Sequence, residues 1–93
     1  MKTYIAERQL ILEVIETGER RSLTVRIGQP YWDEERHVGR CPVEYIGLFD
    51  RLSDAVGADL IQALHLATDI DGMLEPQTNK YRFYYPDGQL YFE

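Results

Sequence analysis

The chain has 93 residues, 44% hydrophobic and 28% charged, and its 16 acidic and 10 basic side chains give a net charge of −6 at pH 7. This length allows one small core, hence a single domain over residues 1–93, and the composition is too apolar for a disordered chain. The negative charge argues against nucleic acid and anionic membranes as ligands, because both bind basic surfaces. It favours a basic protein partner, although an acidic balance also serves solubility alone.

The N-terminal residues predict neither secretion nor membrane insertion. Glu7, Arg8 and Glu13 interrupt the apolar residues there, and no apolar run approaches the length of a membrane span. The single cysteine, Cys41, permits no internal disulfide. We therefore expect a cytoplasmic protein.

The first predicted element is a β-hairpin. Apolar side chains alternate imperfectly over residues 5–15, a polar turn with glycine follows at residues 17–19, and residues 22–27 alternate cleanly. Alternation with a period of two predicts strands, and the short turn predicts that they pair. The side chains expected to point inward are Leu10, Leu12, Val14, Leu23, Val25 and Ile27.

The stretch PYWDEERHVGRC follows at residues 30–41 and contains the only tryptophan and three consecutive carboxylates. Its first seven residues have neither the helical nor the strand period, so we predict an exposed acidic loop. Trp32 in such a loop either packs against the fold as an anchor or contacts a partner, since exposed tryptophan beside charge is typical of a binding hot spot.

A third strand is predicted from about residue 37 to residue 46, with Cys41, Val43 and Tyr45 on one face. Pro42 has no N–H for a ladder hydrogen bond, so this strand is expected at a sheet edge or with a bulge there.

Residues 51–74 show one apolar stripe at spacings of three and four and predict a helix. Gly57 interrupts the pattern, and Asp59 is a candidate N-cap at which the helix begins or restarts. Gly72 and Pro76 mark its end. Asp69 and Asp71 would then oppose the helix dipole at the C-terminus, which hints at a use for exposed charge.

Residues 81–92 predict a second hairpin, with aromatic strands around a Pro-Asp-Gly turn. The predicted order is therefore β-β-β-α-β-β. A single amphipathic helix has only the sheet to cover its apolar stripe, so the expected fold is α+β, a two-layer sandwich of an antiparallel sheet packed on one helix.

Candidate chemistry is sparse. A thiol catalyst at Cys41 needs a nearby base, yet His37 lies roughly 13 Å away along the predicted strand. Successive carboxylates such as Asp33, Glu34 and Glu35 usually point apart, and no metal-binding motif is present. We expect Cys41 to be a buried structural residue, and no catalytic residue, metal or cofactor.

Three segments carry a resemblance: GRCP, VEYIGL and GADLIQALHLA, in this order. They resemble a small uncharacterised bacterial domain family with a Cys-Pro strand and the helix start Gly-x-Asp-x-x-Gln-Ala-Leu. The resemblance covers residues 5–74 and brings no known reaction. It associates the chain with immunity proteins, which bind and neutralise toxins. The matching helix positions are Gly57, Asp59, Gln62, Ala63 and Leu64.

The sequence thus favours a non-enzymatic, acidic protein-binding domain, most plausibly an inhibitor of a basic toxin or nuclease. The predicted contact residues are Tyr31, Trp32, Asp33, Glu34 and Glu35, with a weaker second patch of Asp69, Asp71 and Glu75. The alternative is a homo-oligomeric structural or small-ligand-binding domain, such as a homodimer joined through the aromatic hairpin, since tyrosine and arginine are enriched at interfaces.

Overall fold

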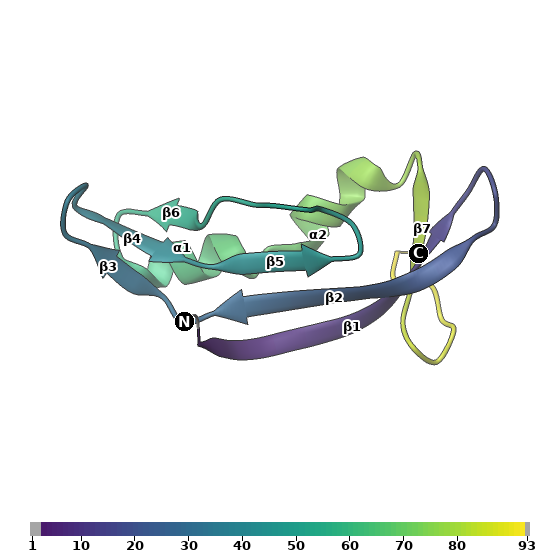
Figure 1. The fold of residues 1–93 in the computed structure, drawn as a ribbon, viewed down its shortest axis with the longest axis horizontal. Helices are drawn as coiled ribbons and strands as arrows, with labels where there is room; N and C mark the ends of the chain where they lie inside the picture. Colours follow the sequence, from purple (N-terminus) through teal and green to yellow (C-terminus); the bar gives the residue numbers. More distant parts are fainter. Residues whose placement is uncertain (1–2, 93) are drawn as a thin grey trace.

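Seven strands and two short helices build the fold of residues 3–92, the part of the chain that the computed structural model describes (Figure 1). The strands are β1 (Tyr4–Val14), β2 (Arg20–Gly28), β3 (Tyr31–Asp33), β4 (Val38–Cys41), β5 (Val43–Ile46), β6 (Ala55–Gly57) and β7 (Tyr81–Tyr84). The helices are α1 (Leu60–Ala67) and α2 (Ile70–Leu74), and a 3-10 turn, η1 (Glu75–Gln77), follows them.

The long hairpin of β1 and β2 is the centre of the main sheet, whose strand order is β5-β2-β1-β7. The predicted alternation is confirmed: the six side chains expected inside are buried or half-buried. The opposite face carries cross-strand polar pairs, among them Arg26 Nε to Glu7 at 3.1 Å and Arg20 Nε to Glu13 at 3.0 Å. One face of this sheet is therefore core and the other is solvated.

The predicted third strand is present in two parts, because Pro42 separates β4 from β5. Residues 38–40 pair with β3, whereas residues 43–46 pair with β2. Gly28 N–H donates to the Pro42 carbonyl at 2.7 Å, which closes the junction between the two strands. Pro42 thus lies where the chain passes from one sheet to the other. At this position its missing N–H breaks no row of hydrogen bonds between strands.

A second sheet, in the order β3-β4-β6, lies at one end of the molecule (Figure 1). The prediction of a loop over residues 30–36 was wrong for residues 31–33, which form β3. A strand of three residues is too short to show a period of two. Residues 31–33 become a strand because they pair with β4, although their own sequence shows no strand pattern.

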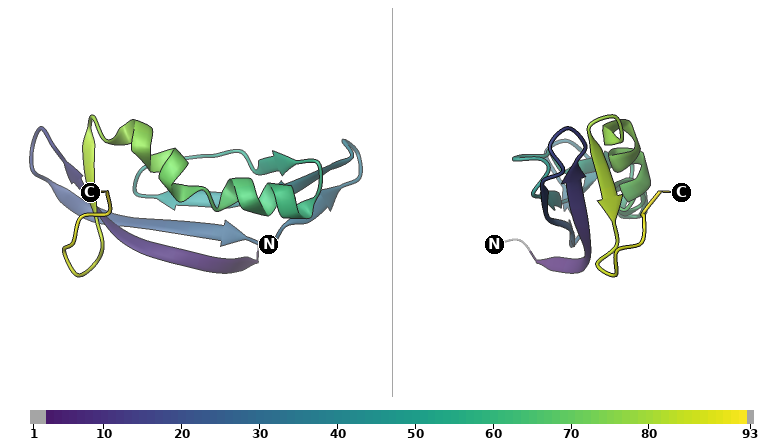
Figure 2. Two further views of the ribbon diagram at one scale, coloured as in Figure 1. Left: turned by 180° about the vertical axis from the view of Figure 1, so that it is seen from behind. Right: turned by 90° about the vertical axis from the view of Figure 1, so that its right-hand side faces the viewer.

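The helical prediction for residues 51–74 also needs correction. Residues 55–57 form β6, and the helix begins at Leu60 after the predicted cap, Asp59, whose carboxylate accepts the Gln62 N–H at 2.8 Å. It ends at Ala67, and Asp69 caps a separate helix, α2. Two short helices therefore replace the expected single one, and both lie on the same side of the sheets (Figure 2).

The C-terminal hairpin is incomplete. β7 pairs with β1, and the turn closes where Tyr85 N–H donates to the Gln89 carbonyl at 2.8 Å. The returning segment makes only an isolated bridge, Tyr84 to Leu90, in place of the predicted strand. Its aromatic rings pack on β7 instead, with the Phe83 and Phe92 centroids 6.3 Å apart.

The expected α+β class is confirmed, but two sheets joined by the β4–β5 segment take the place of one. The core lies between the sheets and the helices, and its largest sealed side chains are Tyr45, Phe83, Leu12 and Leu23. The molecule is elongated, measuring 45 × 23 × 22 Å. Within residues 3–92, no helix has the length and apolar composition needed to cross a membrane.

Candidate functional site

The predicted contact residues lie on the β3–β4 hairpin, which forms one end of the long molecule (Figure 1). Tyr31 is 45% exposed and Trp32 is 41% exposed. Glu34 and Glu35 are exposed in the turn between the strands. The sequence left open whether the tryptophan packs against the fold or faces a partner; the structure places it partly exposed, on a strand and not in a loop.

Asp33 holds the hairpin turn together. Its Oδ1 accepts the Glu35 and Arg36 backbone N–H groups, each at 3.1 Å, and its Oδ2 accepts Arg40 Nε at 2.7 Å. The guanidinium of Arg40, followed by the Arg36 N–H, lowers the pKa of Asp33 below its ordinary value. Both side chains of this ion pair are less than 20% exposed. Asp33 is therefore a structural residue, and its charge is already neutralised within the hairpin.

Tyr31 is tied to the segment before β6. Its hydroxyl donates to Asp54 Oδ2 at 2.5 Å, and this hydrogen bond raises the pKa of the Tyr31 phenol. At the other end of the hairpin, His37 has a positive φ of 55° and closes the turn before β4. The Tyr31–Asp54 hydrogen bond and the Asp33–Arg40 ion pair thus restrain the two ends of β3, although it is an edge strand.

Trp32 projects on the opposite face of β3 from Tyr31 and Asp33, because side chains alternate along a strand. It is paired with Gly39, and a Cβ on Gly39 would meet the Asp59 carbonyl oxygen at 2.3 Å. The indole therefore lies on the face against which α1 begins. Two further apolar side chains are exposed in the first turn of that helix, Leu60 at 38% and Ile61 at 79%.

We call Trp32, Glu34, Glu35, Leu60 and Ile61 the β3–α1 surface. Sequence reasoning missed Leu60 and Ile61 as surface residues. One signal for Ile61 was present, since it falls outside the apolar stripe of the predicted helix. No pattern indicated that the start of this helix lies beside residue 32, because the contact runs through the backbone at Gly39.

The aspartates of the second predicted patch lie at the start of a helix and not at the end of one. Asp69 Oδ1 accepts the Gly72 N–H at 3.1 Å and caps α2, and Asp71 lies in the first turn of that helix. Both carboxylates therefore favour the helix dipole, and the expectation that they oppose it was wrong. Tyr91 donates its hydroxyl to Asp71 Oδ1 at 2.5 Å and accepts Arg8 Nη1 at 2.7 Å.

The exposed residues Asp69, Asp71 and Glu75 do not join the β3–α1 surface. They lie on α2 and η1, with the length of α1 between them and the hairpin (Figure 2).

The structure does not bring Cys41 and His37 together. Cys41 is fully buried, its thiol donates to the Gly28 carbonyl at 3.3 Å, and burial raises the pKa of this thiol. His37 is exposed in the hairpin turn. The expected burial of Cys41 is confirmed. Among residues 3–92, no three His, Cys, Asp or Glu side chains are grouped as they would be around a metal ion.

The chain matches no protein-family model, no curated protein sequence and no solved structure. The resemblance to a small bacterial domain family therefore stays an expectation.

Proposed function

We propose that this chain is a non-enzymatic cytoplasmic binding protein that takes a basic protein partner on the β3–α1 surface. The observation that carries the proposal is the position of Trp32. Its indole is 41% exposed at one end of the molecule, on a strand that the Asp33–Arg40 ion pair and the Tyr31–Asp54 hydrogen bond restrain.

An exposed tryptophan on a restrained strand is suited to anchoring an interface, because the backbone that carries it loses little conformational entropy when a partner binds. Leu60 and Ile61 add exposed apolar side chains at the start of α1, the helix that begins against the same face of the hairpin. Apolar residues at the centre and charges at the rim are the usual composition of a specific interface.

The rim charges favour a basic partner. Glu34 and Glu35 are exposed, and neither takes part in the ion pairs formed within residues 3–92. With the net charge of −6, they would attract a cationic surface and accelerate its approach. A toxin or nuclease that the domain neutralises, as immunity proteins do, is the partner class that this charge and the resemblance support.

The test is capture of a partner by immobilised wild-type protein and by variants of the β3–α1 surface. We expect the wild type and a matched control, Leu90→Ala at the far end, to retain the same basic protein. Trp32→Ala and the pair Glu34→Lys and Glu35→Lys should each lose it. Asp33 is left unchanged, because its substitution would open the hairpin.

Retention by both Trp32→Ala and the Glu34→Lys, Glu35→Lys pair would overturn the proposed surface. If the captured protein is a toxin or nuclease, adding the wild type should abolish its activity, and adding Trp32→Ala should not. Full activity of the captured protein in the presence of the wild type would overturn the inhibitor role.

A second candidate is self-association through β7, which lies at the edge of the main sheet opposite β5. Ile15 is 42% exposed and Leu90 is 53% exposed beside a pocket of about 330 Å³ near this strand. Multi-angle light scattering separates the two: a mass that doubles with concentration supports the second candidate, and a constant monomer mass removes it.

A further inference from the structure

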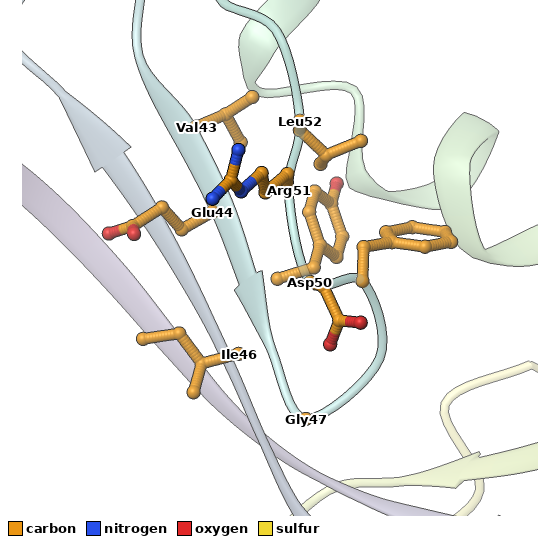
Figure 3. A pocket seen from close by; sticks show the side chains of 9 residues that line it. Val43, Glu44, Ile46, Gly47, Asp50, Arg51 and Leu52 are labelled. Atoms are coloured by element: carbon orange, nitrogen blue, oxygen red, sulfur yellow. The ribbon is translucent and has the colours of Figure 1, made fainter.

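A pocket of about 420 Å³ lies beside β5, between this strand and residues 47–52 (Figure 3). The pocket exists because β6 pairs with β4 and not with β5. The segment before β6 turns away from β5 and leaves the edge of this strand uncovered over residues 43–45. Ligand pockets in proteins commonly have volumes of roughly 300–1,000 Å³.

The register decides which backbone groups of β5 face the pocket. Gly28 N–H donates to the Pro42 carbonyl, so in this antiparallel ladder Glu44 and Ile46 are the residues that bond to β2. Val43 and Tyr45 therefore direct their N–H and C=O groups away from β2. The Tyr45 carbonyl accepts the Leu48 and Phe49 N–H groups at 3.2 and 3.0 Å.

On the pocket side of β5, three backbone groups have no backbone partner among residues 3–92: Val43 N–H, Val43 C=O and Tyr45 N–H. They lie in a row along the open edge, and the two N–H groups are about 7 Å apart. An extended peptide bonds to such a row as an added strand.

A cation lies at one end of this row. Figure 3 shows the Arg51 guanidinium beside Val43 and Glu44, whereas the Asp50 carboxylate points toward the Gly47 end. None of the ion pairs within residues 3–92 includes Arg51. The Glu44 carboxylate lies on the other side of the strand, where it accepts the Tyr4 hydroxyl. The Val43 end of the pocket therefore presents a backbone N–H and a guanidinium to an anion.

We infer that this pocket binds the carboxyl terminus of an extended peptide, which adds to β5 as a short antiparallel strand. In this orientation the peptide carboxylate accepts Val43 N–H and Arg51, and the last peptide N–H donates to the Val43 carbonyl. The carbonyl of the peptide residue two positions before the last accepts Tyr45 N–H. This site is independent of the β3–α1 surface.

The geometry also selects the last side chain of the peptide. A residue paired with Val43 projects its side chain on the same face as Val43, which is the core side of the sheet. Val43 and Leu52 are half-buried there and line the pocket. The carboxy-terminal residue is therefore expected to be apolar.

The test uses a library of acetylated tripeptides with free carboxyl groups and a matched library with amidated ends, added to ¹⁵N-labelled protein. We expect the carboxylate library to shift the Val43 and Tyr45 amide signals and the amidated library to leave them unchanged. Arg51→Gln should weaken binding about tenfold, because it removes a charge-assisted hydrogen bond. The control, Arg36→Gln in the β3–β4 turn, should bind as the wild type does.

Two outcomes would overturn the inference. One is the absence of shifts at Val43 and Tyr45 with a millimolar carboxylate library. The other is equal binding of the amidated library, which would show that no carboxylate is recognised.

Discussion

Tyr45 combines a well-packed ring with a buried hydroxyl that has no hydrogen-bond partner among residues 3–92. Its side chain is 1% exposed, its ring packs edge-on against Phe49 at a centroid distance of 5.6 Å, and its hydroxyl has no hydrogen-bond partner among residues 3–92. A buried hydroxyl without a partner loses its hydrogen bonds to water on folding, and this loss costs free energy. The ring therefore stabilises the core while its oxygen opposes folding.

The substitution Tyr45→Phe removes this hydroxyl and keeps the ring. We expect the free energy of unfolding to rise by about 1 kcal/mol, since a buried polar group without a partner is eliminated. Urea denaturation followed by circular dichroism measures the change. A loss of stability would show that the hydroxyl makes a hydrogen bond in solution.

The same hydroxyl makes stability depend on alkaline pH. Burial raises the pKa of Tyr45 from 10.0 to about 12, and burial followed by a hydrogen bond to Asp71 raises the pKa of Tyr91 to the same value. Below pH 10 the phenols are neutral in both the folded and unfolded states, so the contribution is fully present. As the pH rises toward 12, only the unfolded state ionises, and stability falls.

Tyr45→Phe should therefore lose less stability than the wild type between about pH 10 and pH 12. Melting temperatures across this range test the expectation. Parallel curves for the two proteins would contradict it.

Among the elements, α1 depends on two glycines for its position. A Cβ on Gly39 of β4 would meet the Asp59 carbonyl oxygen at 2.3 Å, and a Cβ on Gly57 of β6 would meet Ala63 N at 2.7 Å. The helix therefore approaches the small sheet at backbone distance. Contacts with backbone atoms cannot relax as those with flexible side chains can, so the two glycines are structural requirements.

Gly39→Ala is expected to lower the free energy of unfolding by about 3 kcal/mol, because the helix must move away from the sheet. The matched control is Gly18→Ala, where no atom lies within 4 Å and only the positive φ of 75° is strained. This control should cost about 1 kcal/mol. Chemical denaturation of both variants tests the difference, and equal losses would argue against the close approach.

The start of α1 is set by its cap. Asp59 accepts the Gln62 N–H at 2.8 Å, and the Gln62 side chain accepts the Ala58 N–H at 2.5 Å. We expect Asp59→Ala to cost about 1 kcal/mol of stability and Asp59→Asn to cost almost nothing, since asparagine is an equally good cap. Thermal denaturation distinguishes them. Equal destabilisation by both variants would indicate a role for the charge beyond capping.

The whole molecule is longer than its size requires. A compact domain of 93 residues has a radius of gyration of about 12 Å, whereas the Cα atoms here give 14.5 Å. The length arises because the small sheet extends the main sheet end to end through the β4–β5 segment (Figure 1). The β3–α1 surface consequently lies at one end, away from the main core.

Small-angle X-ray scattering of the monomer should give a radius of gyration at or slightly above 14.5 Å. A value near 12 Å would mean that the hairpin end folds back in solution, and Trp32 would then be covered. A radius that rises with protein concentration would instead support association through β7.

Several features could be predicted from the sequence because short stretches encode them. The period of two set the β1–β2 hairpin and its inward side chains, and the pattern around Asp59 located the start of α1. Within the candidate site, the rarity of tryptophan singled out Trp32. The sequence did not indicate that Asp33 is neutralised by Arg40, since the two meet only when the turn at residues 34–37 closes.

The sequence by itself determined the α+β class, the first hairpin, the helix cap and an apolar core, because these follow from local periodicity and local hydrogen bonding. Only the tertiary structure decided that three-residue segments become β3 and β6, that one strand passes from one sheet to the other at Pro42, and that an uncovered edge borders a pocket. Pairing between distant strands and contacts through glycine backbones have no repeating side-chain pattern. They depend on which segments of the chain come together when the protein folds.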